Sequence, residues 1–143
     1  MNSYSWEQLR VGLAADFDVT VDDEMMARFY ATTGDANPLH LDAEYASGRG
    51  FRSRVVYGML TASFYSTLAG VHLPGRRCLL HGVKVDFNAP VYVGDRLRVR
   101  GQIAHLSEAY RQIELACDIT NQRAEVVSKA RVRCGLDPNE EQH

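Results

Sequence analysis

The stretch that decides the fold is YGMLTASFYSTLA, residues 57–69. Its large apolar side chains fall on more than one side of a helix, and its polar members are only threonine and serine. A helix that is apolar nearly all round is typical of one enclosed in a core. We therefore expect a buried central helix here, with the rest of the chain packed around it.

Strand-like alternation follows this helix. From residue 78 onward apolar and polar residues alternate, which is the period of a strand with one buried face. The expected strands cover residues 83–87, 96–103, 112–120 and 124–134, with another at 16–21. Short links at 93–95, 107–109 and 121–123 predict an antiparallel meander. Its buried face is expected to lie on the central helix.

The segment before the central helix is expected to be helical and rich in loops. A helix is predicted over residues 22–33, with Thr20 or Asp22 as its cap and Gly34 as its end. A helical turn is expected near 42–46. Helices followed by a strand-rich half predict the α+β class.

Composition and charge exclude several classes of protein. The chain has 143 residues, of which 45% are hydrophobic and 24% charged, so we expect a single domain over 1–143. Its 16 basic and 18 acidic residues provide no positive field for nucleic acid or a membrane surface. No run approaches the roughly 18 apolar residues of a membrane helix, and the first residues lack a signal peptide's apolar region. A cytoplasmic protein is predicted.

Cysteine usage gives no sign of a disulfide framework or a metal site. Cys78, Cys117 and Cys134 are widely spaced and contain no C-x-x-C pair, so we expect reduced core thiols. No set of histidines has the spacing of metal ligands. Neither a metal nor a cofactor is therefore expected.

The segment GDANPLH, residues 34–40, brings a carboxylate, an amide and an imidazole together. Its glycine stops a helix and its proline drives Asn37 toward extended geometry, so an irregular loop is predicted. Asp35 and His40 are candidates for an acid–base pair, because partial burial favours a neutral carboxyl and histidine titrates near neutral pH. The alternative is an Asx turn, in which Asp35 or Asn37 bonds to its own backbone and His40 lies on the surface.

Three segments match motifs of one known family. Residues 35–40, DANPLH, have the form D-x-N-P-x-H; residues 57–63 read YGMLTAS, and residues 87–95 read FNAPVYVGD. Over about residues 15–135 the chain thereby resembles the MaoC-like dehydratases and (R)-specific enoyl-CoA hydratases. The resemblance implies the hot-dog fold, an antiparallel β-sheet wrapped around a long central α-helix, and a homodimer. It also implies reversible hydration of trans-2-enoyl thioesters of coenzyme A or acyl carrier protein to (R)-3-hydroxyacyl thioesters.

The resemblance also implies catalytic residues. Asp35 and His40 would act as an acid–base pair on one water, whose hydroxyl reaches C3 while a proton reaches C2. The backbone N–H of Gly58 would hold the thioester oxygen, a task that suits a helix N-terminus. Close packing at a helix start is the alternative role for Gly58.

Three further positions are implied to contact the substrate. Asn37 would orient the loop or the water, and Ser66 falls where the family often has a serine facing the catalytic aspartate. Tyr57 departs from the family, which more often has histidine there, so a pocket of different shape or polarity is expected. For Tyr57 the alternative is plain packing with its hydroxyl satisfied.

Strand arginines are candidates for binding phosphates. Arg96, Arg98 and Arg100 share one strand face, and with Arg131 and Arg133 they could meet coenzyme A or an acidic carrier protein. Solubility is the alternative reason for these charges.

Two other functions remain open. A hot-dog thioesterase would direct water at the carbonyl carbon with a carboxylate near the central helix, but residues 57–69 contain none. A non-catalytic acyl-binding or dimerisation module would not need the pair Asp35 and His40.

Overall fold

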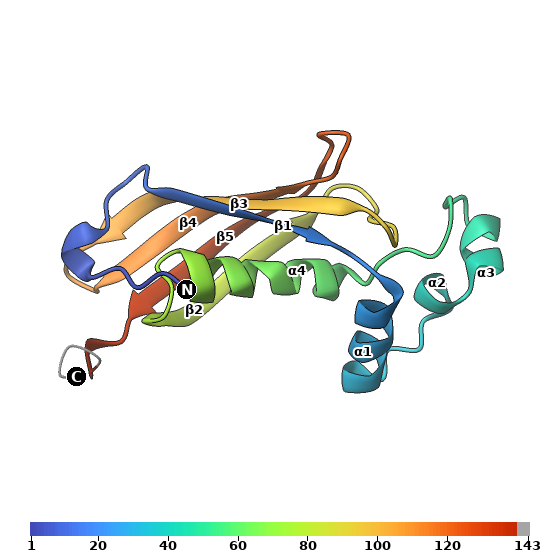
Figure 1. The fold of residues 1–143 in the computed structure, drawn as a ribbon, viewed down its shortest axis with the longest axis horizontal. Coiled ribbons are helices and arrows are strands. Elements are labelled where there is room, and N and C mark those ends of the chain that lie inside the picture. The colour runs from blue at the N-terminus through green and yellow to red at the C-terminus, as the bar shows by residue number, and fades with distance from the viewer. Residues whose placement is uncertain (140–143) are drawn as a thin grey trace.

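The computed structural model describes residues 1–139. Its strands are β1 (Ala14–Thr20), β2 (Cys78–Phe87), β3 (Arg96–Ser107), β4 (Gln112–Thr120) and β5 (Val126–Leu136). Its α-helices are α1 (Asp23–Thr33), α2 (Pro38–Leu41), α3 (Ala43–Gly48) and α4 (Gly58–Thr67). All neighbouring strands are antiparallel, in the order β1-β3-β4-β5-β2, and the sheet curves around α4 (Figure 1). The predicted α+β class and the arrangement of sheet around helix are confirmed.

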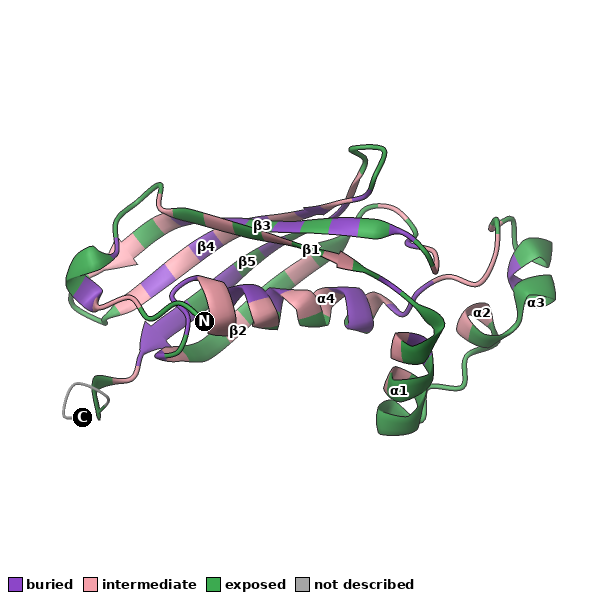
Figure 2. Cartoon of the chain, in the orientation of Figure 1, coloured by how far each residue is buried: buried purple, intermediate pink, exposed green. Residues whose placement is uncertain are grey.

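Alternation along the strands builds the core between the sheet and α4. β4 has the bounds that its sequence predicts, and its inner residues Ile113, Leu115 and Ile119 are fully buried. Burying each such side chain stabilises the fold by about 1.5–3 kcal/mol. Buried residues follow the sheet and one side of α4, whereas α1 and α3 are mostly exposed (Figure 2). The core therefore lies beneath the sheet, and α1, α2 and α3 lie beyond one end of it (Figure 1).

The first helix begins and ends at the predicted signals. The Asp22 carboxylate accepts a hydrogen bond from the Met25 N–H at 2.8 Å, so Asp22 rather than Thr20 is the cap. Gly34 ends the helix with a φ of 70°, a left-handed conformation that glycine adopts without a steric cost.

The expected irregular loop over 34–40 is wrong at its C-terminal end, where α2 forms one short helical turn. The cause is local, because the Asn37 side chain accepts a hydrogen bond from the Leu39 N–H at 3.0 Å and Pro38 occupies the first helical position. The turn predicted near 42–46 is confirmed as α3, with Asp42 as its cap.

The central helix buries only one of its sides, which corrects the expectation of burial all round. Its fully buried residues are Leu60, Thr61 and Tyr65, while Met59, Ser63 and Ser66 on other sides are exposed. One copy of the sheet covers one side of α4, and the apolar Met59 stays 66% exposed. The helical path continues beyond α4 as a π-helical turn, Leu68–His72.

The predicted hairpin between β2 and β3 is wrong. β2 lies at one edge of the sheet beside β5, whereas β3 lies between β1 and β4. Residues 88–95 cross the end of the sheet instead, and the Val56 N–H donates to the Val91 carbonyl at 2.8 Å. Alternation shows which face a side chain occupies but not which strand lies beside it, so the sequence pattern could not reveal this crossing. The links from β3 to β4 and from β4 to β5 join neighbours, as predicted.

The cysteines occupy the expected apolar positions. Cys117 and Cys134 are buried, Cys78 is half-buried, and all three are free thiols. Among residues 1–139, no group of His, Cys, Asp and Glu side chains could hold a metal ion. Within the same residues, no helix is long and apolar enough to cross a membrane.

Candidate active site

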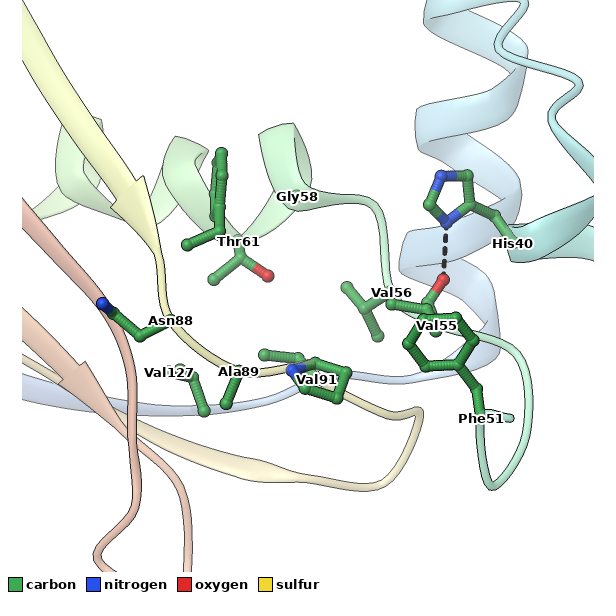
Figure 3. Close-up of a pocket in the computed structure, with 12 residues that line it drawn as sticks. His40, Phe51, Val55, Val56, Gly58, Thr61, Asn88, Ala89, Val91 and Val127 are labelled. Carbon is green, nitrogen blue, oxygen red and sulfur yellow. Dashed lines mark hydrogen bonds between the residues drawn. The ribbon is translucent and has the colours of Figure 1, made fainter. Parts of the chain in front are cut away.

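A pocket of about 410 Å³ opens at the N-terminal end of α4. Its walls come from α2, the segment before α4, the crossing after β2, and β5 (Figure 3). Most of the lining is apolar, and its deepest residues, Val56, Val91 and Val127, are almost completely buried. His40 is the titratable side chain that lines this pocket. Such an apolar pocket with few polar groups is typical of a small-molecule site.

His40 is held in one orientation by the segment that leads into α4. Its Nδ1 lies 2.6 Å from the Val55 carbonyl oxygen (Figure 3). A carbonyl oxygen only accepts hydrogen bonds, so Nδ1 carries the hydrogen and the Nε2 of the neutral ring is left as an acceptor. The geometry therefore prepares Nε2 to take a proton.

Asp35 and Asn37 form the Asx turn that their spacing left open as the alternative. The Asp35 Oδ1 accepts from the Asn37 N–H at 3.1 Å, and the Asn37 Oδ1 accepts from the Leu39 N–H at 3.0 Å. Asn37 thus orients the loop through its cap on α2. The Asp35 carboxylate does not line the pocket, so the structure does not place it beside His40 and Gly58 there.

Tyr57 connects Asp35 to the pocket. Its hydroxyl donates to the Asp35 main-chain oxygen at 2.8 Å, and its ring lies 4.2 Å from the His40 ring and 4.6 Å from the Phe29 ring, centroid to centroid. Burial raises the pKa of Tyr57, and the Asp35 carboxylate raises it further. The phenol therefore remains a hydrogen-bond donor at neutral pH. This is the packing arrangement, with a satisfied hydroxyl, that the sequence left open for Tyr57.

Gly58 places an uncapped helix start against the pocket. Tyr57 occupies the cap position of α4 but makes no side-chain cap bond, and the first N–H groups of a helix have no partner within it. A Cβ on Gly58 would lie 3.3 Å from the Phe87 ring, so this position has little room for a side chain. The Gly58 N–H and its helix dipole are suited to an oxygen that gains negative charge.

The remaining predicted residues lie away from this pocket. Ser66 is on the exposed part of α4, and its predicted contact with the substrate stays a prediction. The five arginines lie on the exposed outer face of the sheet, where Arg98 pairs with Asp18 at 3.0 Å and Arg100 with Asp118 at 3.4 Å. Their predicted role toward phosphates also stays a prediction.

Sequence reasoning identified His40 and Gly58 but missed the other residues of the pocket lining, among them Thr61, Phe87 and Val127. Thr61 lies on its floor, Phe87 on one wall and Val127 at its deepest part. Thr61 could have been found, because it follows Gly58 by three positions and therefore shares a helix face with it. Phe87 begins the motif segment at residues 87–95, but no local signal connects Val127 to this site, since β5 brings it from a distant part of the chain.

The sequence is similar to known proteins over most of its length. Residues 9–124 match the family model described as the MaoC like domain. The chain is 33% identical over 112 residues to a 3-hydroxybutyryl-CoA dehydratase of Methylorubrum extorquens, covering 78% of this chain and 71% of that protein. It is 36% identical over 104 residues to an (R)-specific enoyl-CoA hydratase of Aeromonas caviae, covering 73% of this chain and 78% of that one.

Solved structures show the same fold. The (R)-hydratase from A. caviae superposes with a TM-score of 0.87 and 31% identity, covering 92% of this chain and 99% of that chain. The (R)-hydratase from Pseudomonas aeruginosa superposes with a TM-score of 0.85 and 28% identity, covering 92% of this chain and 84% of that chain. The hot-dog fold implied by the motifs is thereby confirmed.

Proposed function

The chain belongs to the MaoC-like domain family, and on that premise we propose that it hydrates trans-2-enoyl thioesters reversibly to (R)-3-hydroxyacyl thioesters. It is an enzyme of the hydro-lyase class. One observation carries the assignment to this pocket: the His40 imidazole and the uncapped N-terminus of α4 at Gly58 open on the same apolar cavity.

The two groups supply what hydration requires. In the forward direction the water oxygen bonds to C3, the C2–C3 double bond opens, and negative charge moves to the thioester oxygen. The Gly58 N–H stabilises that charge where it develops. The proton removed from the water returns to C2 as the thioester carbonyl re-forms, so the acid–base groups end the turnover as they began it.

We assign the acid–base work to Asp35 and His40. The bond between Nδ1 and Val55 leaves the His40 Nε2 as a proton acceptor. The Tyr57 hydroxyl donates to the Asp35 main-chain oxygen at 2.8 Å, and the Tyr57 ring contacts the His40 ring. Asp35 and His40 are therefore linked through Tyr57, and a substrate and water at the pocket mouth would complete the pair.

Turnover of crotonyl-CoA, followed by the loss of its conjugated ultraviolet absorbance, tests this proposal. We expect Asp35→Asn and His40→Ala each to lower kcat by about 10²–10⁴-fold while thioester affinity changes little. The double variant should be only slightly worse than the worse single one, because both groups serve one proton relay. As controls, Asp16→Asn and His105→Ala alter exposed side chains outside the pocket lining and should keep kcat within about twofold. Full activity in either pair variant would show that the pair is assigned wrongly.

The other functions predict different results in the same assay. A thioesterase would release free coenzyme A, but among residues 1–139 no Asp or Glu lines this pocket to direct water at the carbonyl carbon. A non-catalytic module would bind the thioester without consuming it. Hydration without thiol release therefore supports the hydratase over both.

We further propose that the enzyme is a homodimer. β2 is an edge strand, and its inner side exposes Leu80, Val83 and Phe87 by 44% to 52%. Met59 of α4 is also 66% exposed. An apolar edge of this kind pairs readily with another sheet. Phe87 also lines the pocket, so a second copy on this edge would enclose the site.

Light scattering at micromolar concentration tests the dimer. We expect twice the chain mass for the wild type and a shift toward monomer for Val83→Lys, which places a charge in the apolar edge. Lys84→Arg, on the opposite side of β2, is the control and should remain dimeric. A monomeric wild type would refute the homodimer. The carrier, coenzyme A or acyl carrier protein, the single domain over 1–143 and the cytoplasmic location stay predictions.

A further inference from the structure

One polar atom on the floor of the pocket has no partner. Thr61 lies on α4 one turn beyond Gly58 and is 2% exposed. Within residues 1–139 its Oγ1 makes no hydrogen bond, although it is buried. Figure 3 shows the hydroxyl pointing from α4 into the space lined by Val56, Val91 and Val127.

A threonine inside a helix commonly bonds to the carbonyl one turn earlier. Here that carbonyl belongs to Tyr57, and it accepts the backbone N–H groups of Leu60 and Thr61, both at 3.1 Å. The Thr61 hydroxyl instead points into the pocket. Because buried polar groups in proteins are nearly always hydrogen-bonded, its partner is expected to come from whatever fills the pocket.

The residues around the Thr61 hydroxyl bear on the length of acyl chain that the pocket can bind. Val56, Val91 and Val127 provide apolar contacts, and although the Asn88 amide also lines the pocket, no hydrogen bond joins it to Thr61 within residues 1–139. Three residues of helix rise by only about 4.5 Å, so a chain laid along α4 from Gly58 reaches Thr61 after a few carbons. A longer alkyl chain would remove water from the hydroxyl and offer no replacement bond.

We propose that Thr61 is a specificity-determining residue that restricts the pocket to short-chain acyl thioesters. This inference rests on the proposed function, because it places the thioester oxygen at the Gly58 N–H. A four-carbon acyl group leaves water at the Thr61 hydroxyl. An eight-carbon group displaces that water and leaves the hydroxyl unpaired.

The test compares crotonyl-CoA with trans-2-octenoyl-CoA. Thr61→Val keeps the shape of the side chain and removes the hydroxyl, so we expect the ratio of kcat/KM for octenoyl to that for crotonyl to rise roughly tenfold, equivalent to about 1.4 kcal/mol. Thr61→Ser keeps the hydroxyl and should retain the wild-type ratio within about threefold. Ser63→Ala removes a hydroxyl from the exposed side of the same helix and is expected to leave both rates unchanged. Thr61→Ala replaces Thr61→Val if the latter does not fold.

A binding measurement separates this proposal from the proposed reaction. The saturated thioesters butyryl-CoA and octanoyl-CoA cannot be hydrated, and calorimetry gives their Kd values without turnover. We expect Thr61→Val to shift the Kd ratio toward octanoyl-CoA by the same roughly tenfold factor. If that shift occurs but the wild type hydrates neither enoyl thioester, the proposed reaction fails and the role of Thr61 stands. Unchanged ratios in Thr61→Val, equal shifts in Thr61→Ser, or a wild type that binds neither saturated thioester would overturn the inference.

Discussion

Replacing Tyr57 by phenylalanine tests how the Asp35 loop is held. Tyr57→Phe removes the hydroxyl that donates to the Asp35 main-chain oxygen at 2.8 Å and keeps the ring that packs against His40 and Phe29. Because burial and the Asp35 carboxylate raise the pKa of Tyr57, its hydroxyl keeps its proton at neutral pH and can donate this bond. The substitution therefore removes one hydrogen bond and little else.

The expected loss of stability is small. A neutral hydrogen bond contributes about 0.5–1.5 kcal/mol, and Asp35 lies in an exposed loop where water can replace the lost donor. We expect a loss near 0.5–1 kcal/mol, which would lower Tm by roughly 2–4 °C for a protein of this length.

The expected loss of activity is larger, because the freed carbonyl belongs to Asp35, whose carboxylate we propose as one of the two acid–base groups. A displacement of about 1 Å in a reacting group can lower a rate by about 100-fold. We expect Tyr57→Phe to lower kcat by about tenfold or more and to change KM by less than about threefold. Such a split between kcat and KM indicates misplacement of an acid–base group rather than loss of substrate contacts.

Tyr65→Phe is the matched control. It also removes one tyrosine hydroxyl from the α4 region, but that hydroxyl donates to the Ser128 Oγ at 2.9 Å and does not contact the Asp35 loop. Urea unfolding followed by the single tryptophan, Trp6, and crotonyl-CoA turnover would be measured for both variants. The control should lose about 1–2 kcal/mol of stability and keep kcat within about twofold. Wild-type kcat in Tyr57→Phe, or an equal loss of kcat in Tyr65→Phe, would refute the positioning role of Tyr57.

Three other predictions follow from buried or capping groups. Burial raises the pKa of the Cys117 thiol to about 12, and the hydrogen bond between Cys134 and Cys78 raises the pKa of Cys134 and lowers that of Cys78. At pH 8 an aromatic disulfide reagent should therefore label Cys78 first and the other two only on unfolding; equal rates in the native protein would contradict this. Asp95→Ala removes a buried carboxylate that accepts hydrogen bonds from the Tyr92 N–H at 3.0 Å and from the Gln122 amide at 2.9 Å. The free energy of unfolding should therefore fall by about 2–3 kcal/mol. A loss below about 1 kcal/mol would show that these two bonds do not hold the turn before β3. Asp22→Ala should cost about 1 kcal/mol in the same urea experiment, with Asp22→Asn, which can still cap, as the control.

Local chemistry explains which elements the sequence could predict. β4 starts and ends where its alternation starts and ends, and α1 runs from its Asp22 cap to Gly34. Both depend on signals within a few residues of the boundary. The short helix α2 depended on a cap as well, but its signal was ambiguous, since the same asparagine and proline also favour an irregular turn.

The candidate site was predictable only in part, because its residues differ in how their positions are determined. Asp35, Asn37 and His40 belong to a recognisable local motif, and Gly58 to a helix start. The His40 ring is fixed by its contact with the Val55 carbonyl oxygen. Every residue carries a backbone carbonyl, so the amino-acid sequence could not indicate this contact. The Asx turn at Asp35 and the proposed acid–base motif involve the same residues. The spacing of these residues therefore could not show whether Asp35 has a structural or an acid–base role.

The error in strand order and the missed pocket residues have one physical cause. The link at 93–95, expected to join two neighbouring strands, is instead part of the crossing over residues 88–95, and that crossing supplies Ala89, Pro90 and Val91 to the pocket. A tight hairpin would have kept this segment beside β2 and left the N-terminal end of α4 without an opposite wall. Strand alternation stops at Asn88-Ala89-Pro90, and proline cannot continue the ladder of a central strand. The place where periodicity fails is therefore the place where the chain leaves the sheet to build one wall of the pocket.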